Sequence, residues 1–531
     1  MLKIECAMSK KILLIRGGSV LSKGRLASIS IGPPLGIAYL AACLRKENYN
    51  VSILDAAGED LNKITSMRHF DLLGLTNEEI LERFPSDIDM VCFSSMFSNE
   101  WMYLKNLIKS VKKRFPQTVT VLGGEHASAL PEYSLQSCDE LDYVMSGEGE
   151  HSIVQLTKCL FENLGERSTV SGLSYRSSFG VQTNPKVNRI KAVDEIPFPA
   201  WDLTPLENYL REGKASIFRM GHRIVPILAS RGCPYECKFC SNPAMYGNRY
   251  FVRDVEEVIR EIKFLIQHYR ITGFEFHDLT FITKKSWVKQ FCRRLIEENM
   301  EIEWTVPTTR SEAIDEEVVT LLKKSGCKVL FLTPDSGSPR MIEEMLKKVN
   351  LKKMTQTARI ILKNGLILRM NIVFGFPGER HVDVWRSILY GFKLAFFGVD
   401  SIIFLRFVPY PGSAYFEQLL KEGKLPPLGP EFDHFLVLNI YNELSLIHSY
   451  SEHLSDRAVR IYMFIGLIST HMVFYLCRPW QILFTLKRLI QRSPVTTIDF
   501  LIFALISKKF RLLMKLIKTI TGAPMLRRLS W

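Results

Sequence analysis

Two long stretches of the chain alternate short apolar runs with amphipathic segments, which is the pattern of parallel strands covered by helices. In the first stretch, the apolar runs are residues 12–15, 51–55, 90–95, 119–122 and 143–145. A helix is expected to begin near Pro34, because proline at a helix entry loses no hydrogen bond. The pattern predicts an α/β fold with a doubly wound, Rossmann-like domain over residues 1–190.

Serine or glycine follows several of these runs, where the chain must turn from a strand into a helix. Ligands of doubly wound sheets bind where the carboxyl ends of the strands meet such loops. The residues expected along this edge are Ser94, Ser95, Gly123, Gly124, Gly147 and Glu148. Each glycine turn alone is weak evidence of a ligand site, because any tight turn uses glycine.

The alternation resumes after a polar linker. Residues 166–200 have weak hairpin character and end in a proline-stiffened joint, and residues 191–220 are expected to connect two domains. The apolar runs of the second stretch are residues 225–229, 274–278, 303–306, 328–332, 366–373 and 401–407. Six strand-and-helix units over residues 221–430 predict a partial (β/α)6 barrel, with its active groups at the carboxyl ends of the strands.

Composition adds limits on class and location. The chain has 531 residues, of which 47% are hydrophobic and 23% charged, as expected for two or three folded domains. Its eleven cysteines form no even disulfide framework, which predicts a reduced, cytoplasmic location. The N-terminal apolar run is too short for an export signal. The net charge is +14, but residues 461–531 contribute +10 of it, so the body gives no reason to expect nucleic acid as a partner.

The last region, residues 431–531, is apolar and basic and is expected to be an α-helical extension. Residues 461–477 carry no charge, a length at the lower limit for crossing a bilayer. In residues 480–490 and 498–520, Lys and Arg interrupt apolar positions at helical spacing. Such helices suit an anionic membrane surface, which predicts peripheral association at the inner face of the membrane. Packing on the barrel and a true membrane span are the alternatives.

Three cysteines lie close together at the start of the second domain. Cys233, Cys237 and Cys240 have the spacing C-x3-C-x2-C, so one tight loop can bring their thiolates to a single centre. A structural zinc site needs four ligands, whereas thiolates are also the usual ligands of iron–sulfur clusters. Three thiolates on a [4Fe–4S] cube leave one iron open to a substrate or cofactor. A zinc loop that lacks its fourth ligand and three unrelated buried thiols are the alternatives.

This loop, with Phe239 before its last cysteine, resembles the signature of the radical S-adenosylmethionine (radical SAM) enzymes. The resemblance implies that the three cysteines hold a [4Fe–4S] cluster whose open iron binds S-adenosylmethionine. One electron from the cluster would cleave the sulfonium to give a 5′-deoxyadenosyl radical. An electron donor such as flavodoxin or ferredoxin is therefore implied as a partner.

Residues at the barrel strand ends match the family's S-adenosylmethionine contacts in order. The implied contacts are Phe239, Asp278, Arg310, Ser336, Asn371, Gly375 and Glu379. Of these, Asp278 would lie near the methionine amino group, Arg310 would pair with its carboxylate, and the last three would border the adenine and nucleoside. Asp335 stands where the subgroup usually has Glu in Glu-Ser-Gly, and this departure weakens a ribose contact for it.

Residues 10–190 resemble the cobalamin-binding domain that precedes the radical core in one large radical SAM subgroup. The likeness rests on the turns at residues 34–36, 123–127 and 147–150. It implies that the serine, glycine and glutamate residues of the strand-end loops bind cobalamin. The D-x-H-x-x-G motif of the wider cobalamin family is absent, as is common in this subgroup. His126 is interpreted as a loop residue and not as a cobalt ligand.

Together these resemblances imply a cobalamin-dependent radical SAM methyltransferase that acts on an unactivated carbon. It would use two molecules of S-adenosylmethionine, one to methylate the cobalamin and one to produce the radical. The apolar, basic C-terminal region suggests a hydrophobic small molecule or lipid as the substrate. An oxidative cyclase or carbon-skeleton enzyme of the same subgroup is one alternative. A non-catalytic cobalamin or redox sensor is another.

Overall fold

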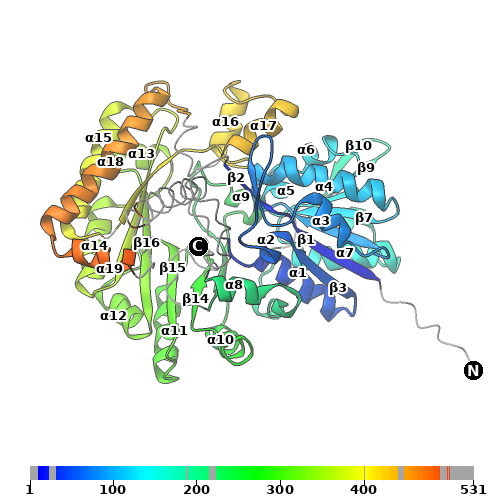
Figure 1. Cartoon of the computed structure of the whole chain (residues 1–531), viewed down its shortest axis with the longest axis horizontal. Helices are drawn as coiled ribbons and strands as arrows, with labels where there is room; N and C mark the ends of the chain where they lie inside the picture. Colours follow the sequence, from blue (N-terminus) through cyan, green and yellow to red (C-terminus); the bar gives the residue numbers. More distant parts are fainter. Residues whose placement is uncertain are drawn as a thin grey trace, which may run out of the picture.

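The computed structural model of the chain describes residues 10–22, 31–186, 189–213, 223–399, 401–439 and 448–490, together with 499 and 502. Two α/β lobes lie side by side (Figure 1). The N-terminal lobe contains a seven-stranded sheet, and the second lobe contains a six-stranded sheet. The predicted α/β class and the order of the two sheets along the chain are confirmed.

The sheet of the N-terminal lobe has the strand order β10-β9-β8-β7-β6-β1-β3. Its parallel strands are β1 (Lys11–Arg16), β3 (Asn50–Asp55), β6 (Met90–Ser94), β7 (Val119–Gly123) and β8 (Tyr143–Met145). These are the five predicted strands. The hairpin of β9 (Leu173–Ser177) and β10 (Gly180–Thr183) adds two antiparallel strands at one edge. Part of the expected linker therefore belongs to this sheet.

Helices cover both faces of the sheet, as a doubly wound fold requires. Alternate residues of β1 fall into two separate hydrophobic clusters, because successive side chains of a strand point to opposite faces. One cluster includes α1 (Leu35–Lys46) and α7 (Gly149–Phe161), and the other includes α4 (Trp101–Arg114). An additional small sheet, which the sequence pattern did not reveal, consists of β2 (Ser19–Leu21), β5 (Asp71–Leu73) and β4 (Ile64–Ser66).

The second lobe is an open, all-parallel sheet whose strands follow in chain order. They are β11 (Ile224–Ile227), β14 (Gly273–Phe276), β15 (Glu303–Thr309), β16 (Cys327–Asp335), β17 (Ile367–Phe374) and β18 (Ser401–Arg406). The connecting helices are α10 (Val255–Tyr269), α11 (Lys285–Glu297), α12 (Glu316–Lys324), α14 (Leu351–Lys363) and α15 (His381–Phe397). Because β11 does not pair with β18, the barrel is partial, as predicted.

The segment after the barrel first returns to the N-terminal lobe. After α16 (Ala414–Lys421), helix α17 (Pro430–Leu438) packs on α4. Lys105 of α4 forms an ion pair with buried Asp433 of α17, and the Tyr133 hydroxyl donates a hydrogen bond of 2.7 Å to the same carboxylate. The first helix of the C-terminal helical region therefore contacts the N-terminal lobe.

Helix α18 (Asp456–Cys477) contains the apolar run that was considered as a membrane span. It is long and apolar enough to cross a bilayer. One face, however, packs on α15 and β18 (Figure 1), with Gly466 directly against the Phe404 ring. Helix α18 is thus a cover of the barrel, followed by α19 (Gln481–Ile490). The expected helical stretch 498–520 lies outside the described residues, apart from positions 499 and 502.

The contact at Gly466 predicts that Gly466→Ala destabilises the protein. A Cβ atom there would lie 2.7 Å from the Phe404 ring, and overpacking of this kind costs about 1–3 kcal/mol. Gly36→Ala in α1 is the matched control, because a Cβ atom there meets nothing within 4 Å. Thermal unfolding should show a lowered Tm for the first variant only. Equal Tm values would show that α18 does not pack as described.

Candidate functional site

The three cysteines lie on a loop that begins near the carboxyl end of the first barrel strand. Its base is closed by the antiparallel pairing of β12 (Ser230–Gly232) with β13 (Tyr250–Val252). Gly232 has a φ of +80°, and a side chain there would collide with the carbonyl oxygen of Arg249. Glycine is therefore required directly before the first cysteine.

Cys233, Cys237 and Cys240 are each partly buried. Burial raises the pKa of all three thiols, and that of Cys240 to about 12. Among the described residues, no three His, Cys, Asp or Glu side chains converge closely enough to hold a single metal ion. In a cube each cysteine ligates a different iron atom, so the three thiolates need not meet at a single metal ion. The donor set therefore fits a [4Fe–4S] cluster better than a zinc ion.

Two buried cations lie next to this loop. The Arg310 guanidinium stacks on the Tyr235 ring at 3.6 Å and donates hydrogen bonds to the carbonyl oxygens of Lys347 and Lys348 at 2.7 and 2.6 Å. The Lys347 ammonium forms an ion pair with Asp335. Arg310 thus braces the cysteine loop, and its predicted pairing with a carboxylate of S-adenosylmethionine would compete with these bonds. The sequence does not identify Lys347 as part of the site, because only the fold brings it next to the cysteine loop.

Asp278 also acts as a brace. Its buried carboxylate accepts a hydrogen bond of 3.1 Å from the Ala229 amide and another from the Ser230 hydroxyl. Burial raises the pKa of Asp278 to about 6. The side chain thereby ties the second barrel strand to the start of the cysteine loop. A contact with the methionine amino group remains a prediction.

Asn371 and Glu379 present buried acceptors near the end of β17. Asn371 lies on the face of the strand opposite to Met370 and Ile372, which are fully buried. Its Oδ1 atom has no hydrogen-bond partner among the described residues, and the same holds for Oε1 of Glu379. Buried polar atoms are normally satisfied, so these two atoms fit polar groups of a bound nucleoside such as S-adenosylmethionine.

The turn that contains Glu379 meets the cysteine loop. The Gly375 amide donates a hydrogen bond of 2.6 Å to the Glu379 carboxyl group, and burial raises the pKa of Glu379 to about 8. The rings of Phe376 and Phe239 lie 5.8 Å apart. Phe239, Gly375 and Glu379 are thus brought together, as their predicted roles require.

Ser336 is hydrogen-bonded within the protein, and its contact with S-adenosylmethionine remains a prediction. It is fully buried, its hydroxyl lies 3.1 Å from that of Ser387 in α15, and it accepts a hydrogen bond from the Ser338 amide. These bonds hold the loop after β16 against α15, so Ser336 positions this loop.

Four of the predicted cobalamin residues lie together at the ends of β6 and β7. Ser94 pairs with Gly123, and the Ser95 amide donates a hydrogen bond of 2.8 Å to the Gly123 carbonyl. Gly124 has a φ of +109°, and a Cβ atom there would lie 2.6 Å from the Ser95 carbonyl oxygen. The buried Ser95 hydroxyl has no hydrogen-bond partner within the described part of the chain. This hydroxyl fits a polar group of a ligand bound at the edge, such as cobalamin.

His126 is not a loop residue, contrary to the sequence-based interpretation. It lies fully buried in α5 (Glu125–Ala129), where its ring stacks on Trp101 at 5.0 Å and Nδ1 lies 3.0 Å from the Ser98 hydroxyl. Burial lowers the pKa of His126 to about 3, so the ring is neutral. It packs the core between α4 and α5.

The two lobes meet beside the cysteine loop. Helix α5, which follows β7, packs on α9 (Asn242–Tyr246), which follows Cys240. Small residues allow a close approach, since a Cβ atom at Gly412 would lie 2.7 Å from Ala244 and 3.0 Å from Ala129. The carboxyl edge of the N-terminal sheet is thus placed next to the cysteines.

The remaining two predicted cobalamin residues, Gly147 and Glu148, lie on the same boundary. A Cβ atom at Gly147 would lie 3.5 Å from the Met245 carbonyl oxygen. The Glu148 carboxylate is 3.0 Å from Arg189 and 3.4 Å from Arg231. These ion pairs use the carboxylate that was expected to face cobalamin, and Arg231 was not identified as functional from the sequence.

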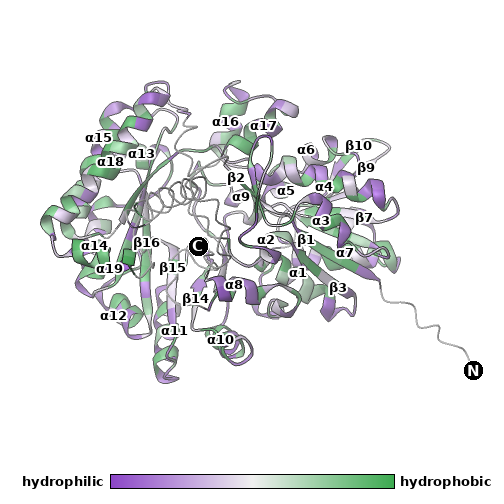
Figure 2. Cartoon of the chain, in the orientation of Figure 1, coloured by the Kyte–Doolittle hydropathy of each residue, from purple (hydrophilic) through white to green (hydrophobic). Residues whose placement is uncertain are grey.

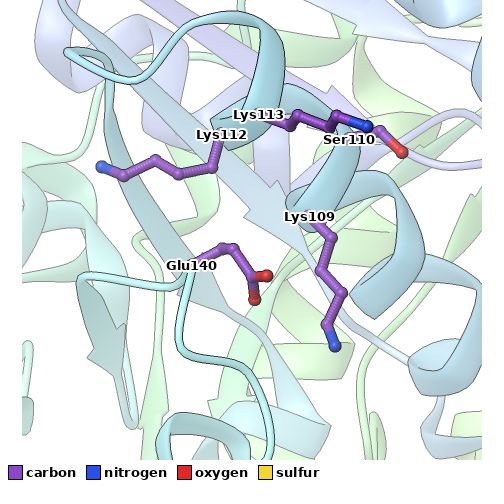
Figure 3. Close-up of a pocket in the computed structure, with 5 residues that line it drawn as sticks. All are labelled: Lys109, Ser110, Lys112, Lys113 and Glu140. Atoms are coloured by element: carbon purple, nitrogen blue, oxygen red, sulfur yellow. The ribbon is translucent and has the colours of Figure 1, made fainter.

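A separate pocket lies at the opposite edge of the N-terminal sheet. Figure 3 shows its lining residues, which are Lys109, Ser110, Lys112, Lys113 and Glu140. They come from the end of α4 and the loop before β8, and Lys112 forms a 2.7 Å ion pair with Asp142. The pocket shares no residue with the cysteine loop or with the carboxyl ends of the strands, so it plays no part in the site described above.

Comparison with known proteins agrees with this geometry. The Radical SAM superfamily profile matches residues 227–390, and the B12 binding domain profile matches residues 26–157. An uncharacterised methyltransferase of Pyrococcus horikoshii is 31% identical over 398 residues, which cover 74% of this chain and 80% of that protein. The chain belongs to the cobalamin-dependent radical SAM family. It is an enzyme whose cofactors are a [4Fe–4S] cluster, S-adenosylmethionine and cobalamin.

Other relatives of this radical SAM enzyme have named activities. Cytidylyl-2-hydroxyethylphosphonate methyltransferase of Streptomyces wedmorensis is 27% identical and covers 80% of this chain and 84% of its own. The hopanoid C-3 methylase of Methylococcus capsulatus is 25% identical over 64% of this chain and 60% of its own. The fold resembles that of OxsB, a cobalamin-dependent S-adenosylmethionine radical enzyme solved with aqua-cobalamin and S-adenosylmethionine. Its TM-score is 0.64 at 14% identity, with 98% of this chain and 82% of OxsB covered.

Replacement of Cys233, Cys237 or Cys240 by Ala is predicted to abolish cluster assembly, because each thiolate would hold one iron. Iron and sulfide content after anaerobic reconstitution measures this. Cys159→Ala is the matched control, since Cys159 is also partly buried but lies in α7. Unchanged iron content in any of the three variants would remove that cysteine from the cluster.

Proposed function

We propose that this enzyme transfers a methyl group to an unactivated carbon of a hydrophobic substrate, for which a lipid is the strongest candidate. The observation that supports this most is the boundary between the lobes. There α5, next to the predicted cobalamin residues, packs on α9, next to Cys240. Cofactors bound at the two sites would border the same space, as methyl transfer to a radical requires.

The roles of the residues follow from their places. We propose that Cys233, Cys237 and Cys240 hold the cluster, while Asn371 and Glu379 satisfy donors of S-adenosylmethionine. When bound, the cofactors supply a hydrogen-abstracting radical and a transferable methyl group. The chain itself binds and orients the cofactors and the substrate, and it excludes water from them. Arg310 and Asp278 hold the cysteine loop in place.

The overall reaction balances with two external electrons. The hydrogen of the substrate C–H bond ends on 5′-deoxyadenosine, and the methyl carbon of the second S-adenosylmethionine forms the new C–C bond. One S-adenosylmethionine thus becomes methionine and 5′-deoxyadenosine, and the other becomes S-adenosylhomocysteine. The two electrons neutralise the two sulfonium charges. We propose flavodoxin or ferredoxin as their source.

The test is an anaerobic assay of the reconstituted protein with S-adenosylmethionine, dithionite and a membrane lipid extract. Equal amounts of 5′-deoxyadenosine and S-adenosylhomocysteine are expected, together with lipids that gain the mass of one CH2 group. Cys240→Ala is the control and should form none of these. 5′-Deoxyadenosine without S-adenosylhomocysteine would favour a cyclase-type reaction, and neither product would favour a sensor.

We also propose that the enzyme is cytoplasmic and docks on the inner face of the membrane through α15, α18 and α19 (Figure 2). Helices α15 and α18 pack together, and each exposes an apolar stripe at helical spacing. The exposed residues are Val382, Trp385, Leu389 and Phe396 on α15, Ile461, Phe464, Ile468, Met472 and Leu476 on α18, and Leu483, Phe484 and Ile490 on α19. The exposed basic side chain of Lys487 on α19 suits anionic headgroups.

Flotation with vesicles of anionic phospholipid tests this surface. Phe464→Glu should reduce the vesicle-bound fraction, because it places a carboxylate in the apolar stripe. Phe179→Glu is the matched control, since Phe179 is also exposed but lies at the tip of the β9–β10 hairpin. Equal binding of both variants, or no binding of the unmodified protein, would contradict the proposed surface.

A further inference from the structure

Three buried charged residues and one partly buried arginine meet between the lobes. Arg231 lies on β12, two residues before Cys233, and its side chain is only 4% exposed. Its guanidinium is 2.5 Å from Glu150 and 3.4 Å from Glu148. Arg189, from the segment between the lobes, lies 3.0 Å from Glu148. Two cations therefore face two carboxylates, and each buried charge is compensated.

The carboxylates belong to the other cofactor site. Glu148 and Glu150 follow Gly147 at the carboxyl end of β8, and Glu150 lies in the first turn of α7. Burial opposes ionisation of Glu150, but Arg231 outweighs it and holds the pKa of Glu150 below its usual value. The Arg231 guanidinium also lies 5.1 Å from the centre of the Tyr39 ring in α1. One side chain next to the cluster thus contacts two elements of the cobalamin lobe.

The other contacts between the lobes described above differ in kind or in place. Small residues lie where α5 meets α9, and α17 joins α4 through the ion pair of Lys105 with Asp433, which is far along the chain from the cysteines. A guanidinium between two carboxylates accepts only a narrow range of orientations. Arg231 is therefore the contact best placed to control how the cluster loop sits against the cobalamin edge.

We propose that Arg231 is a positioning residue that sets the distance and orientation between the cluster and cobalamin through Glu148 and Glu150. This inference rests on the proposed function, because it assigns these residues to the coupling of the two cofactors. Cleavage of S-adenosylmethionine needs only the cluster, whereas methyl transfer also needs cobalamin at a fixed distance and orientation from the cluster. A residue that sets this distance and orientation therefore affects methyl transfer more than cleavage of S-adenosylmethionine.

The matched control is Arg253. It is also a buried arginine, but its guanidinium is 2.5 Å from Glu261 in α10 and donates a hydrogen bond of 2.8 Å to the Leu228 carbonyl, both within the second lobe. Arg253→Lys and Arg231→Lys therefore remove the same guanidinium fork from a buried pair. Arg253 also lies 3.8 Å from Asp194 of the connecting segment, but only the Arg231 change removes a pair with Glu148 and Glu150.

The experiment uses the full chain reconstituted with iron, sulfide and hydroxocobalamin, and reduced until both the cluster and the cobalt are paramagnetic. Pulsed EPR measures the dipolar coupling between the two centres, which is inversely proportional to the cube of their distance. The unmodified protein and Arg253→Lys should show one narrow coupling. Arg231→Lys and Glu150→Gln should show a shifted or broadened coupling while iron and cobalamin contents stay unchanged.

An unchanged coupling in Arg231→Lys and Glu150→Gln would overturn the proposal, and so would an equal change in Arg253→Lys. Glu150→Gln keeps the shape of the side chain, so it remains informative if an arginine variant folds poorly. The coupling does not depend on which product the enzyme makes. Failure of methyl transfer with intact coupling would therefore count against the proposed function alone.

Discussion

The structure depends on one constraint, which is that two parallel sheets must present their carboxyl ends to the same space. In each sheet the residues predicted to contact cofactors lie at or near that end, where ligands of such folds bind. The contact of α5 with α9 meets this constraint, since α5 follows a strand of one sheet and α9 follows the cysteine loop of the other. Helix α17 strengthens the arrangement by reaching back from the barrel to α4.

The boundary is held partly by charge, which has a physical consequence. A buried ion pair is a poor source of stability, because desolvation cancels much of the attraction, but it strongly disfavours any arrangement that leaves a charge unpaired. The pairs of Arg231 with Glu148 and Glu150 therefore select one arrangement of the lobes rather than simply adding to their adhesion. Around the cysteines, the hydrogen bonds and ion pairs of Arg310, Lys347 and Asp278 favour one arrangement of a single loop in the same way.

Helix α18 shows how the same apolar segment can be read in two ways. Its length and hydropathy satisfy the criteria for a membrane span. Its glycine at position 466 instead fits against Phe404 of the barrel, and one helical face is buried there. Hydropathy averages over a helix and does not resolve its faces, so it could not distinguish a covering helix from a spanning one.

Local patterns along the chain are sufficient to predict the two α/β sheets, their order, the cysteine loop and the strand-end turns. These features follow from local periodicity and from residues such as Gly232 and Gly124, whose backbone conformations only glycine adopts easily. The hydrogen bonds and ion pairs of the polar side chains depend instead on the tertiary fold. Ser336, Arg310 and Glu148 are predicted to contact cofactors from a family resemblance and from their places after strands, and the structure shows that each also makes hydrogen bonds or ion pairs within the protein. The partners of a charged side chain come from distant segments, and the sequence alone does not show which segments meet.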